Sequence, residues 1–519
     1  NTHISIYLYL FGSWSVMFSW FNNFISYFIK PVTNNKVNVS NKQYELLKPI
    51  AKTEFKVYLN DPTTPDLMDT VSLPVWRNFW PKTRFEGFET GKEIKLDTLQ
   101  WQSAQAMWFI SQALQAMQVG TGNNEWPLDK PNWSTGRPLT VRPRAGRDFN
   151  AFYDRKTLSF FFNNDQNNVV YTVESLDIVS HETGHAILDI FRPDLFNTQA
   201  LEVWAYHEAF ADIVAILTSL NIPHVVEAVR QETNGDITKN NVVSRVGEEL
   251  GSALYRLTKG RDGRDSAYLR NAVNTFKFTT PEKLPQQASD DKLASEPHSF
   301  ARVFVGAFYD ILAGMVNKCL ASGMSFADSV NKAKEDAVKL IVRGTMMAPA
   351  SPRFYDAVAR SILAIDRQFA SEYQDIIKSA FTARNILNNK QVKMLGVKSL
   401  ANVDSLSYSN PQPEGSDVNT LVRLKNTKTI KLSDHFGVKA QSDNPLYNCE
   451  IEVPCEEYME MAGNDHMVDS IGHSQKLAVN SARECVRFLH QHDLVQLNES
   501  TDNKPFKIEN NKLIRNYFI

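Results

Sequence analysis

The stretch that decides how this chain is interpreted is DIVSHETGHAILD, residues 177–189. Glu174 and Asp177 fall in the first turn of the helix predicted here, where carboxylates suit the helix dipole. On this helix His181 and His185 are four residues apart, so both imidazoles leave the same face, about one turn apart. Two neutral imidazole nitrogens at this spacing can bind one Zn²⁺ at roughly 2.0–2.1 Å. The spacing therefore predicts a zinc-binding helix.

Glu182 follows the first histidine and is rotated by about 100° from it around the helix. Its carboxylate can therefore face a water on the metal without binding the metal itself. Zinc lowers the pKa of such a water to about 7, and an adjacent carboxylate can take its proton. The alternative is an amphipathic helix whose two histidines only face solvent.

A third ligand is expected on the next helix, predicted at residues 201–220. A catalytic zinc needs three protein ligands and an open position, and Glu208 supplies a carboxylate. Asp212 lies one turn later on the same face, where it can accept a hydrogen bond from a ligand imidazole and fix its tautomer. His207 is the rival ligand, but it points about 100° away from Glu208. A merely solvated carboxylate is the alternative for Glu208.

These motifs resemble those of the thermolysin-like metallopeptidases, the gluzincins that combine HExxH with a glutamate. Residues 177–189 follow the family's helix on both sides of the motif, and HEAFAD, residues 207–212, resembles its NEAxSD element. His207 replaces the usual asparagine, which alters a contact to a zinc ligand. The resemblance covers residues 95–389. It implies an α+β, two-lobed zincin fold, with a β-rich N-terminal lobe carrying the active-site helix and a helical C-terminal lobe.

Three further positions carry the resemblance. Asn150 and Ala151, in NAFY, match an edge strand that holds an extended substrate by β-augmentation. Arg270 follows Leu269, as in a Leu-Arg pair whose arginine grips a substrate carbonyl. His298 precedes a helix similar to the one after the family's transition-state histidine, although no tyrosine matches the one that assists it. A stray surface arginine or a core histidine is the alternative at each position.

The resemblance implies a zinc endopeptidase with one Zn²⁺ per chain and protein or peptide substrates. Glu182 would be the general base and His298 the oxyanion donor. Four apolar residues fall where the family lines its pocket for the residue after the cut, which suggests cleavage before hydrophobic residues. These four are Val169, Ile178, Val246 and Leu269.

Two other classes of function stay open. One is a catalytically idle peptide-binding protein on the same scaffold, which would need neither Glu182 nor His298. The other is a zinc hydrolase of a non-peptide amide. The NAFY edge strand favours an extended peptide over such a substrate, but only weakly.

Calcium is doubtful from the same comparison. Asp177 and Glu248 match two of the family's calcium carboxylates, but Ser219 and Val243 stand where others would be. Two carboxylates rarely make a site of six to eight oxygens.

Composition sets broader limits. The chain has 519 residues, 43% of them hydrophobic and 22% charged, which is typical of a globular protein of two or three domains. Its net charge of -2 gives no electrostatic reason to expect nucleic acid as a partner. Cys319, Cys449, Cys455 and Cys485 are too few for a disulfide framework, although pairing of Cys449 with Cys455 stays open.

Residues 4–21 are uncharged and long enough to span a bilayer. No cation precedes them, so a signal or anchor segment and a buried apolar stretch are both open, and membrane association or secretion depends on the former. The expected organisation comprises an apolar segment at 1–30, an N-terminal extension at 31–94, the N-terminal lobe at 95–190, the helical lobe at 191–389 and an accessory α/β region at 390–519.

Other patterns predict further elements. Helices are expected at 97–119, 298–320, 325–344, 353–365, 368–386 and 475–492. A hairpin is expected at 150–162, strands at 421–432 and 447–455, and a linker at 402–418.

Overall fold

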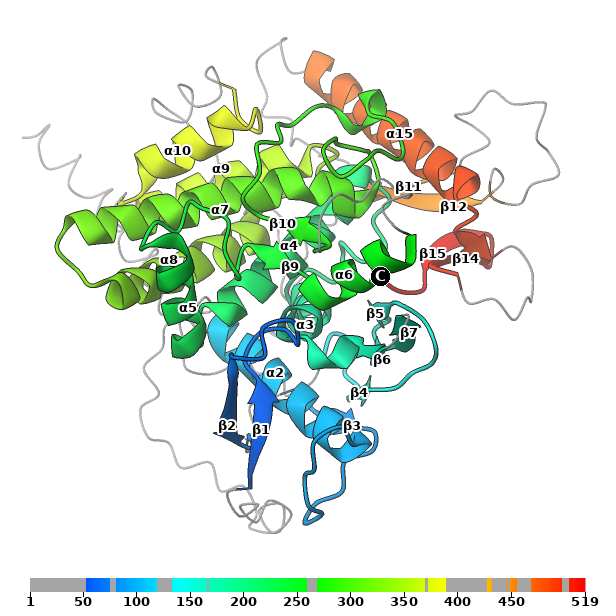
Figure 1. The fold of residues 1–519 in the computed structure, drawn as a ribbon. Helices are drawn as coiled ribbons and strands as arrows, with labels where there is room; N and C mark the ends of the chain where they lie inside the picture. The colour runs from blue at the N-terminus through cyan, green and yellow to red at the C-terminus, as the bar shows by residue number, and fades with distance from the viewer. Residues whose placement is uncertain are drawn as a thin grey trace, which may run out of the picture.

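A computed structural model describes residues 53–74, 81–118, 133–165, 168–258, 268–368, 372–388, 427–431, 446, 449–454, 468–496 and 504–518. Over these residues the fold is α+β, with long helices and several small sheets (Figure 1). The apolar segment 4–21, the polar stretch 402–418 and Cys455 lie outside them, and the predictions made for them stay predictions.

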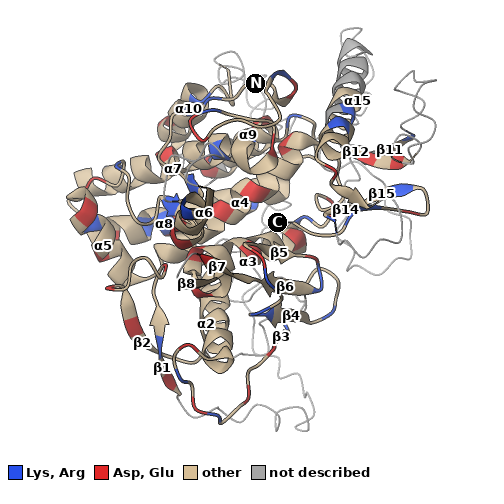
Figure 2. Cartoon of the chain, turned by 45° about the vertical axis from the view of Figure 1, so that its right-hand side comes forward, with Lys and Arg blue, Asp and Glu red and all other residues tan. Residues whose placement is uncertain are grey.

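Helix α2, Leu99–Gln118, forms where the apolar spacing predicted it and is buried along most of its length. It carries no charged residue, as the tan ribbon of Figure 2 shows. A hairpin of β1, Glu54–Tyr58, and β2, Met68–Ser72, packs against it. The Trp101 indole donates a hydrogen bond of 2.6 Å to the Lys56 carbonyl oxygen, which joins the hairpin to the helix.

A four-stranded sheet follows in the order β3-β4-β6-β5. The first three strands are parallel neighbours, whereas β5 pairs antiparallel with β6 and forms one edge. The predicted hairpin at 150–162 is therefore confirmed, with Arg155 at a positive φ of 69° in its turn. The strands are β3, Thr83–Phe85; β4, Leu139–Arg142; β5, Ala151–Tyr153; and β6, Thr157–Phe160.

The central pair of helices is α3, Leu176–Phe191, and α4, Leu201–Ser219. Both begin within a few residues of the predicted positions. Glu174, however, does not lie in the first turn of α3, as the sequence suggested. It closes a short 3-10 turn, η3, Thr172–Glu174, and the extended backbone of Ser175 separates that turn from the helix.

Four helices, at the four positions predicted between residues 298 and 386, form the layer beyond α4. They are α7, Pro297–Ala321; α8, Phe326–Met347; α9, Phe354–Gln368; and α10, Gln374–Ala383. Helix α7 is apolar and long enough to cross a membrane, but most of its apolar stretch is buried inside the protein. Shorter elements connect this layer to α4: α5, Pro223–Thr233; α6, Glu248–Thr258; and the two-stranded pair β9, Arg245–Val246, and β10, Arg270–Asn271.

The C-terminal residues build a second small core. A five-stranded sheet in the order β11-β12-β15-β14-β13 packs against helix α15, Val468–Gln491. This core includes Leu201 and Trp204 from the start of α4, so the accessory region is docked on the helix that carries Glu208. The strands are β11, Thr427–Lys431; β12, Glu450–Pro454; β13, Val495–Gln496; β14, Phe506–Glu509; and β15, Lys512–Arg515.

Candidate metal centre

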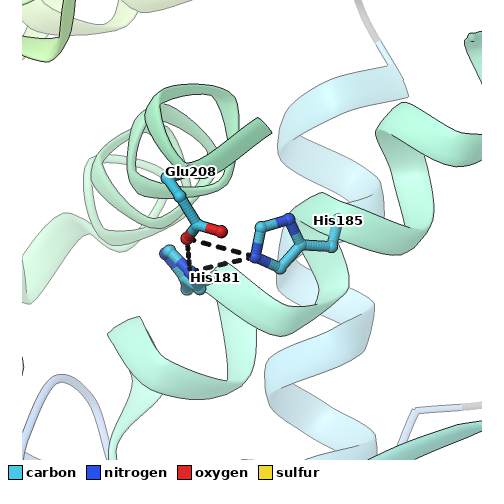
Figure 3. A group of neighbouring side chains, drawn as sticks. All are labelled: His181, His185 and Glu208. Carbon is cyan, nitrogen blue, oxygen red and sulfur yellow. Dashed lines mark hydrogen bonds and ion pairs between the residues drawn. The ribbon is translucent and has the colours of Figure 1, made fainter. Parts of the chain in front are cut away.

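His181, His185 and Glu208 converge on one point between α3 and α4 (Figure 3). The two histidine Nε2 atoms are 3.2 Å apart, and Glu208 Oε2 is 3.3 Å from that of His181 and 3.5 Å from that of His185. All three side chains are buried. In the part of the chain that the structure describes, they are the one group of His, Cys, Asp and Glu close enough to hold a metal ion.

The spacing of these three atoms fits a zinc ion. Ligand atoms at roughly 2.0–2.1 Å from one tetrahedral ion lie about 3.3–3.4 Å apart, close to the three separations found. Within the described part of the chain Glu208 Oε2 also lacks an aligned hydrogen bond, although imidazole nitrogens surround it. A buried carboxylate oxygen without a hydrogen-bond donor is costly, and a shared cation would remove that cost. The donor set, two imidazoles and one carboxylate, is the one that catalytic zinc takes in thermolysin.

Gly184 allows the two helices to bring the ligands together. A Cβ atom at this position would lie 2.8 Å from the Ala211 Cα atom and 3.1 Å from the Val214 Cβ atom, both on α4. The glycine and the small Ala211 therefore let α3 and α4 pack closely. This close approach brings Glu208 within reach of histidines on the neighbouring helix.

Asp212 holds the His181 imidazole. Its Oδ1 is 2.8 Å from His181 Nδ1, which leaves Nε2 facing the centre. Arg270 in turn donates to both Asp212 oxygens, at 2.8 and 2.7 Å. Burial opposes ionisation of Asp212, but Arg270 and His181 hold the pKa of its carboxyl well below the usual range. Burial alone would lower the pKa of His181, yet Asp212 and Glu208 raise it to about 9.

His207 supports the His185 imidazole from the neighbouring helix α4. Its Nδ1 is 3.0 Å from the Nδ1 of His185. Burial lowers the pKa of His185 to about 4 and that of His207 well below its ordinary value, so both rings are neutral. One of the two Nδ1 atoms must donate the shared hydrogen. If His185 donates, its Nε2 keeps a lone pair for a metal.

Glu182 is buried beside the triad, and its Oε2 has no hydrogen-bond partner among the residues that the structure describes. Burial raises the pKa of its carboxyl to about 8, against the opposing effect of His181. An unpartnered buried carboxyl at a cluster of metal-binding side chains suits a proton acceptor, because no structural contact uses that oxygen.

His298 reaches the same centre from the first turn of α7. Its Nε2 is 3.1 Å from Glu208 Oε2, and its Nδ1 is 2.7 Å from Glu296 Oε1. Burial opposes protonation, but both carboxylates raise the pKa of His298 well above its ordinary value, so the ring is a cation. The His298 side chain is 29% exposed, so solvent reaches the centre on the side where His298 lies.

Glu296 is a site residue whose role the sequence did not indicate. Its carboxylate accepts hydrogen bonds from the backbone N–H groups of His298 and Ser299, at 3.0 and 2.7 Å, and so caps α7. The same carboxylate holds the His298 ring. The sequence feature that could have pointed to this role is a carboxylate two residues before His298, at the start of a predicted helix.

The residues predicted to bind substrate are partly gathered near the centre. Arg270 contacts Asp212, as described, and Ala151 lies on the edge strand β5. The Asn150 side chain turns back to accept a hydrogen bond of 2.8 Å from the Ala151 N–H. Val246 and Leu269 are adjacent, since the Leu269 N–H donates to the Val246 carbonyl at 3.0 Å.

The other two apolar residues lie on different elements. Ile178 is buried on α3, three residues before His181. Val169 is 44% exposed on β8, Asn168–Tyr171, which pairs with β7, Phe162–Asp165.

The carboxylates matched to calcium ligands are held by the protein itself. Asp177 accepts hydrogen bonds from Ser175 Oγ at 2.6 Å, the Ile178 N–H at 2.8 Å and the Gly247 N–H at 2.5 Å. Glu248 pairs with Arg245. Ser219 and Val243 are both buried.

The sequence matches no protein-family model, and no curated protein is similar to it in sequence. A function for the chain therefore has to be argued from the geometry of this centre and from the motifs that build it.

Proposed function

We propose that this chain is a zinc-dependent endopeptidase of the thermolysin-like kind, acting on protein or peptide substrates before hydrophobic residues. The observation that carries the proposal is the triangle of His181, His185 and Glu208 ligand atoms, with edges of 3.2–3.5 Å, beside the unpartnered carboxyl of Glu182. The two-lobed zincin arrangement, with lobes at 95–190 and 191–389, belongs to the same proposal.

His181, His185 and Glu208 would hold the zinc ion, which would supply a Lewis acid for the scissile carbonyl and lower the pKa of water. Glu182 takes a proton from the attacking water and delivers it to the leaving amine. His298, as a cation held by Glu296, donates a hydrogen bond to the developing oxyanion. Asp212 and Arg270 keep the His181 ring in the tautomer and orientation that metal binding needs.

The idle peptide-binding alternative is less well supported by the site. A protein that only holds peptides has no use for a buried, unpartnered carboxyl, because such a group costs stability. It also has no use for a cationic histidine aimed at the same point.

Incubation of the purified chain with casein, with and without a zinc chelator, tests the proposal. We expect casein cleavage that the chelator abolishes and added zinc restores. Glu182→Gln is the matched control, because it should bind the metal and fail to cleave. Absence of cleavage by the zinc-loaded wild type on casein and on a panel of unstructured peptides would reject the proposal.

A further inference from the structure

The last described residues return to the edge strand of the four-stranded sheet. Tyr153 donates its backbone N–H to the Phe518 carbonyl oxygen at 3.1 Å and accepts the Phe518 N–H at 2.8 Å. The two residues form an antiparallel bridge on the side of β5 away from β6. The red end of the ribbon accordingly lies beside β5 in Figure 1, and the C-terminus has the same place in Figure 2. We call residues 516–518 the tail.

The tail also packs against the metal centre. The Phe518 ring stacks on His207, with centroids 3.8 Å apart, and on His185, with centroids 4.9 Å apart. Phe196 contacts the same ring edge-on at 5.3 Å. Phe518 is only 1% exposed. One tail residue therefore contacts both a metal ligand and the imidazole that supports it.

An extended peptide would need the same edge. Binding by strand addition uses the backbone N–H and C=O groups of an exposed edge strand. In an antiparallel strand alternate residues face the same side, so Ala151 and Tyr153 both point their backbone groups outward. The tail already uses both groups of Tyr153. Because the tail pairs antiparallel with β5, its chain direction is from Tyr153 towards Ala151. A peptide bound antiparallel to β5 would have the same direction.

We propose that the tail is a tethered occupant of the peptide-binding edge, and that it competes with substrate for β5. The chain then binds an extended peptide only when the tail leaves Tyr153. This inference rests on the proposed function, because it assigns β5 to peptide substrates.

Two features limit how firmly the tail is held. Among the described residues its backbone pairs with β5 only at Phe518, although the Tyr517 ring also packs on Phe152 of β5, with centroids 4.7 Å apart. Arg515, the residue before the tail, is buried. Its Nε and Nη2 atoms lack hydrogen-bond partners among the described residues. This missing hydrogen bonding costs free energy when the tail is bound to β5. The Arg515 guanidinium instead lies over aromatic rings, 4.0 Å from the Phe518 centroid. A surface depression, lined in part by Asp154, Lys507 and Tyr517, borders the tail.

Peptide binding to two versions of the Glu182→Gln chain tests the proposal without turnover. One version is full length, and the other ends at Arg515 and so lacks the tail and the residue after it. The probe is a fluorescein-labelled, unstructured casein peptide, followed by fluorescence anisotropy. If the tail leaves the edge open less than a tenth of the time, the shortened chain binds at least about tenfold more tightly. A free peptide KLIRNYFI should compete with the probe, whereas the same peptide with Ala at the position of Phe518 should compete poorly.

Equal or weaker binding by the shortened chain, at an unchanged thermal midpoint, overturns the proposal. If the shortened chain fails to fold, Phe518→Ala in the full-length chain replaces it, with hydrogen exchange measured on a fragment containing Tyr153. Faster exchange and tighter peptide binding support the tail as a competitor, and unchanged values of both overturn it. Zinc-dependent casein cleavage by the wild type with equal peptide affinities overturns the tail proposal alone. Absence of zinc and of cleavage at both lengths overturns the proposed function, and this inference with it.

Discussion

At the scale of single residues, the proposal gives two neighbouring glutamates different roles. Imidazole nitrogens lie 3.3 and 3.5 Å from Glu208 Oε2, whereas Glu182 Oε2 has no hydrogen-bond partner among the described residues. A ligand and a proton acceptor respond differently when each carboxylate is replaced by an amide.

Glu182→Gln should keep about one zinc per chain and lower kcat by roughly 10²–10⁴, because a general base contributes that much. Glu208→Gln should instead lose zinc at chelator concentrations that the wild type resists. Zinc content after dialysis and initial rates of casein cleavage measure both effects. Loss of zinc from the first variant but not from the second would reverse the assigned roles.

His298→Ala should lower kcat by roughly 10²–10³ with little change in KM, because an oxyanion donor acts in the transition state. Zinc content should stay near that of the wild type, since His298 contacts the ligand Glu208 but is not one of the three ligands. Steady-state kinetics and elemental analysis check this. An unchanged kcat, or a variant that loses its zinc, would contradict it.

The local motifs predicted part of the centre at this scale. His181, Glu182 and His185 lie within one helical turn, and Glu208 and Asp212 within another, so helical geometry alone places them. Phe518 could not be predicted, because it lies more than 300 residues from both imidazoles and no local pattern indicates that it pairs with a sheet edge. Glu296 was visible in the sequence, but its contact with the His298 ring depends on how the chain enters α7.

At the scale of elements, the close approach of α3 and α4 decides whether the three ligands meet. Gly184 and Ala211 set the distance between these helices, since a methyl group on Gly184 would overlap α4. The ligands come from both helices, so their spacing should follow the helix separation.

Gly184→Ala should therefore lower the free energy of unfolding by roughly 1–3 kcal/mol, as for overpacking of a core. It should also weaken zinc retention, because the helices must separate. Ser180→Ala is the matched control on the same helix: it removes a buried hydroxyl that lacks a partner and should leave zinc retention unchanged. Chemical denaturation and zinc titration measure both. Equal zinc affinity in both variants would show that helix separation does not control the centre.

Elements with a clear sequence pattern were predictable, whereas some short elements without one were not. The apolar spacing of residues 97–119 predicted α2, and the aromatic run around a polar turn predicted the β5–β6 hairpin. Helix α6 was missed because it is short and buries few residues. Glu174 was misplaced because a single extended residue, Ser175, ends the preceding turn, and backbone conformation at one position has no periodic signal.

At the scale of the whole molecule, acidic groups from distant segments meet where α6 begins. The Glu249 N–H donates to Asp61 Oδ2 at 3.2 Å, which joins the N-terminal hairpin to α6. Burial, with Asp61 and Glu174 adding to it, raises the pKa of Glu249 to about 9. The pKa of Glu174 is raised to about 7, mainly by burial. Uncharged carboxyl groups are thus favoured in the folded chain.

Raised pKa values make stability fall as pH rises, because the folded chain binds more protons than the unfolded chain does. For Glu249 the stability present below its unfolded pKa of about 4.3 is lost progressively up to a pKa of about 9. Glu249→Gln should therefore raise the thermal midpoint by a few degrees at pH 8.5 and change it little at pH 5. Calorimetry at both values tests this, and an equal difference at the two pH values would contradict it.

The proposed activity depends most directly on the metal that His181, His185 and Glu208 would hold. Elemental analysis of the wild-type chain, purified without added metal and then titrated with zinc, measures this. We expect about one tightly bound zinc per chain, because the three ligand atoms already have the spacing that a tetrahedral ion requires. His185→Ala should reduce that content sharply. A wild-type chain that contains no zinc and takes up none on titration would contradict the account.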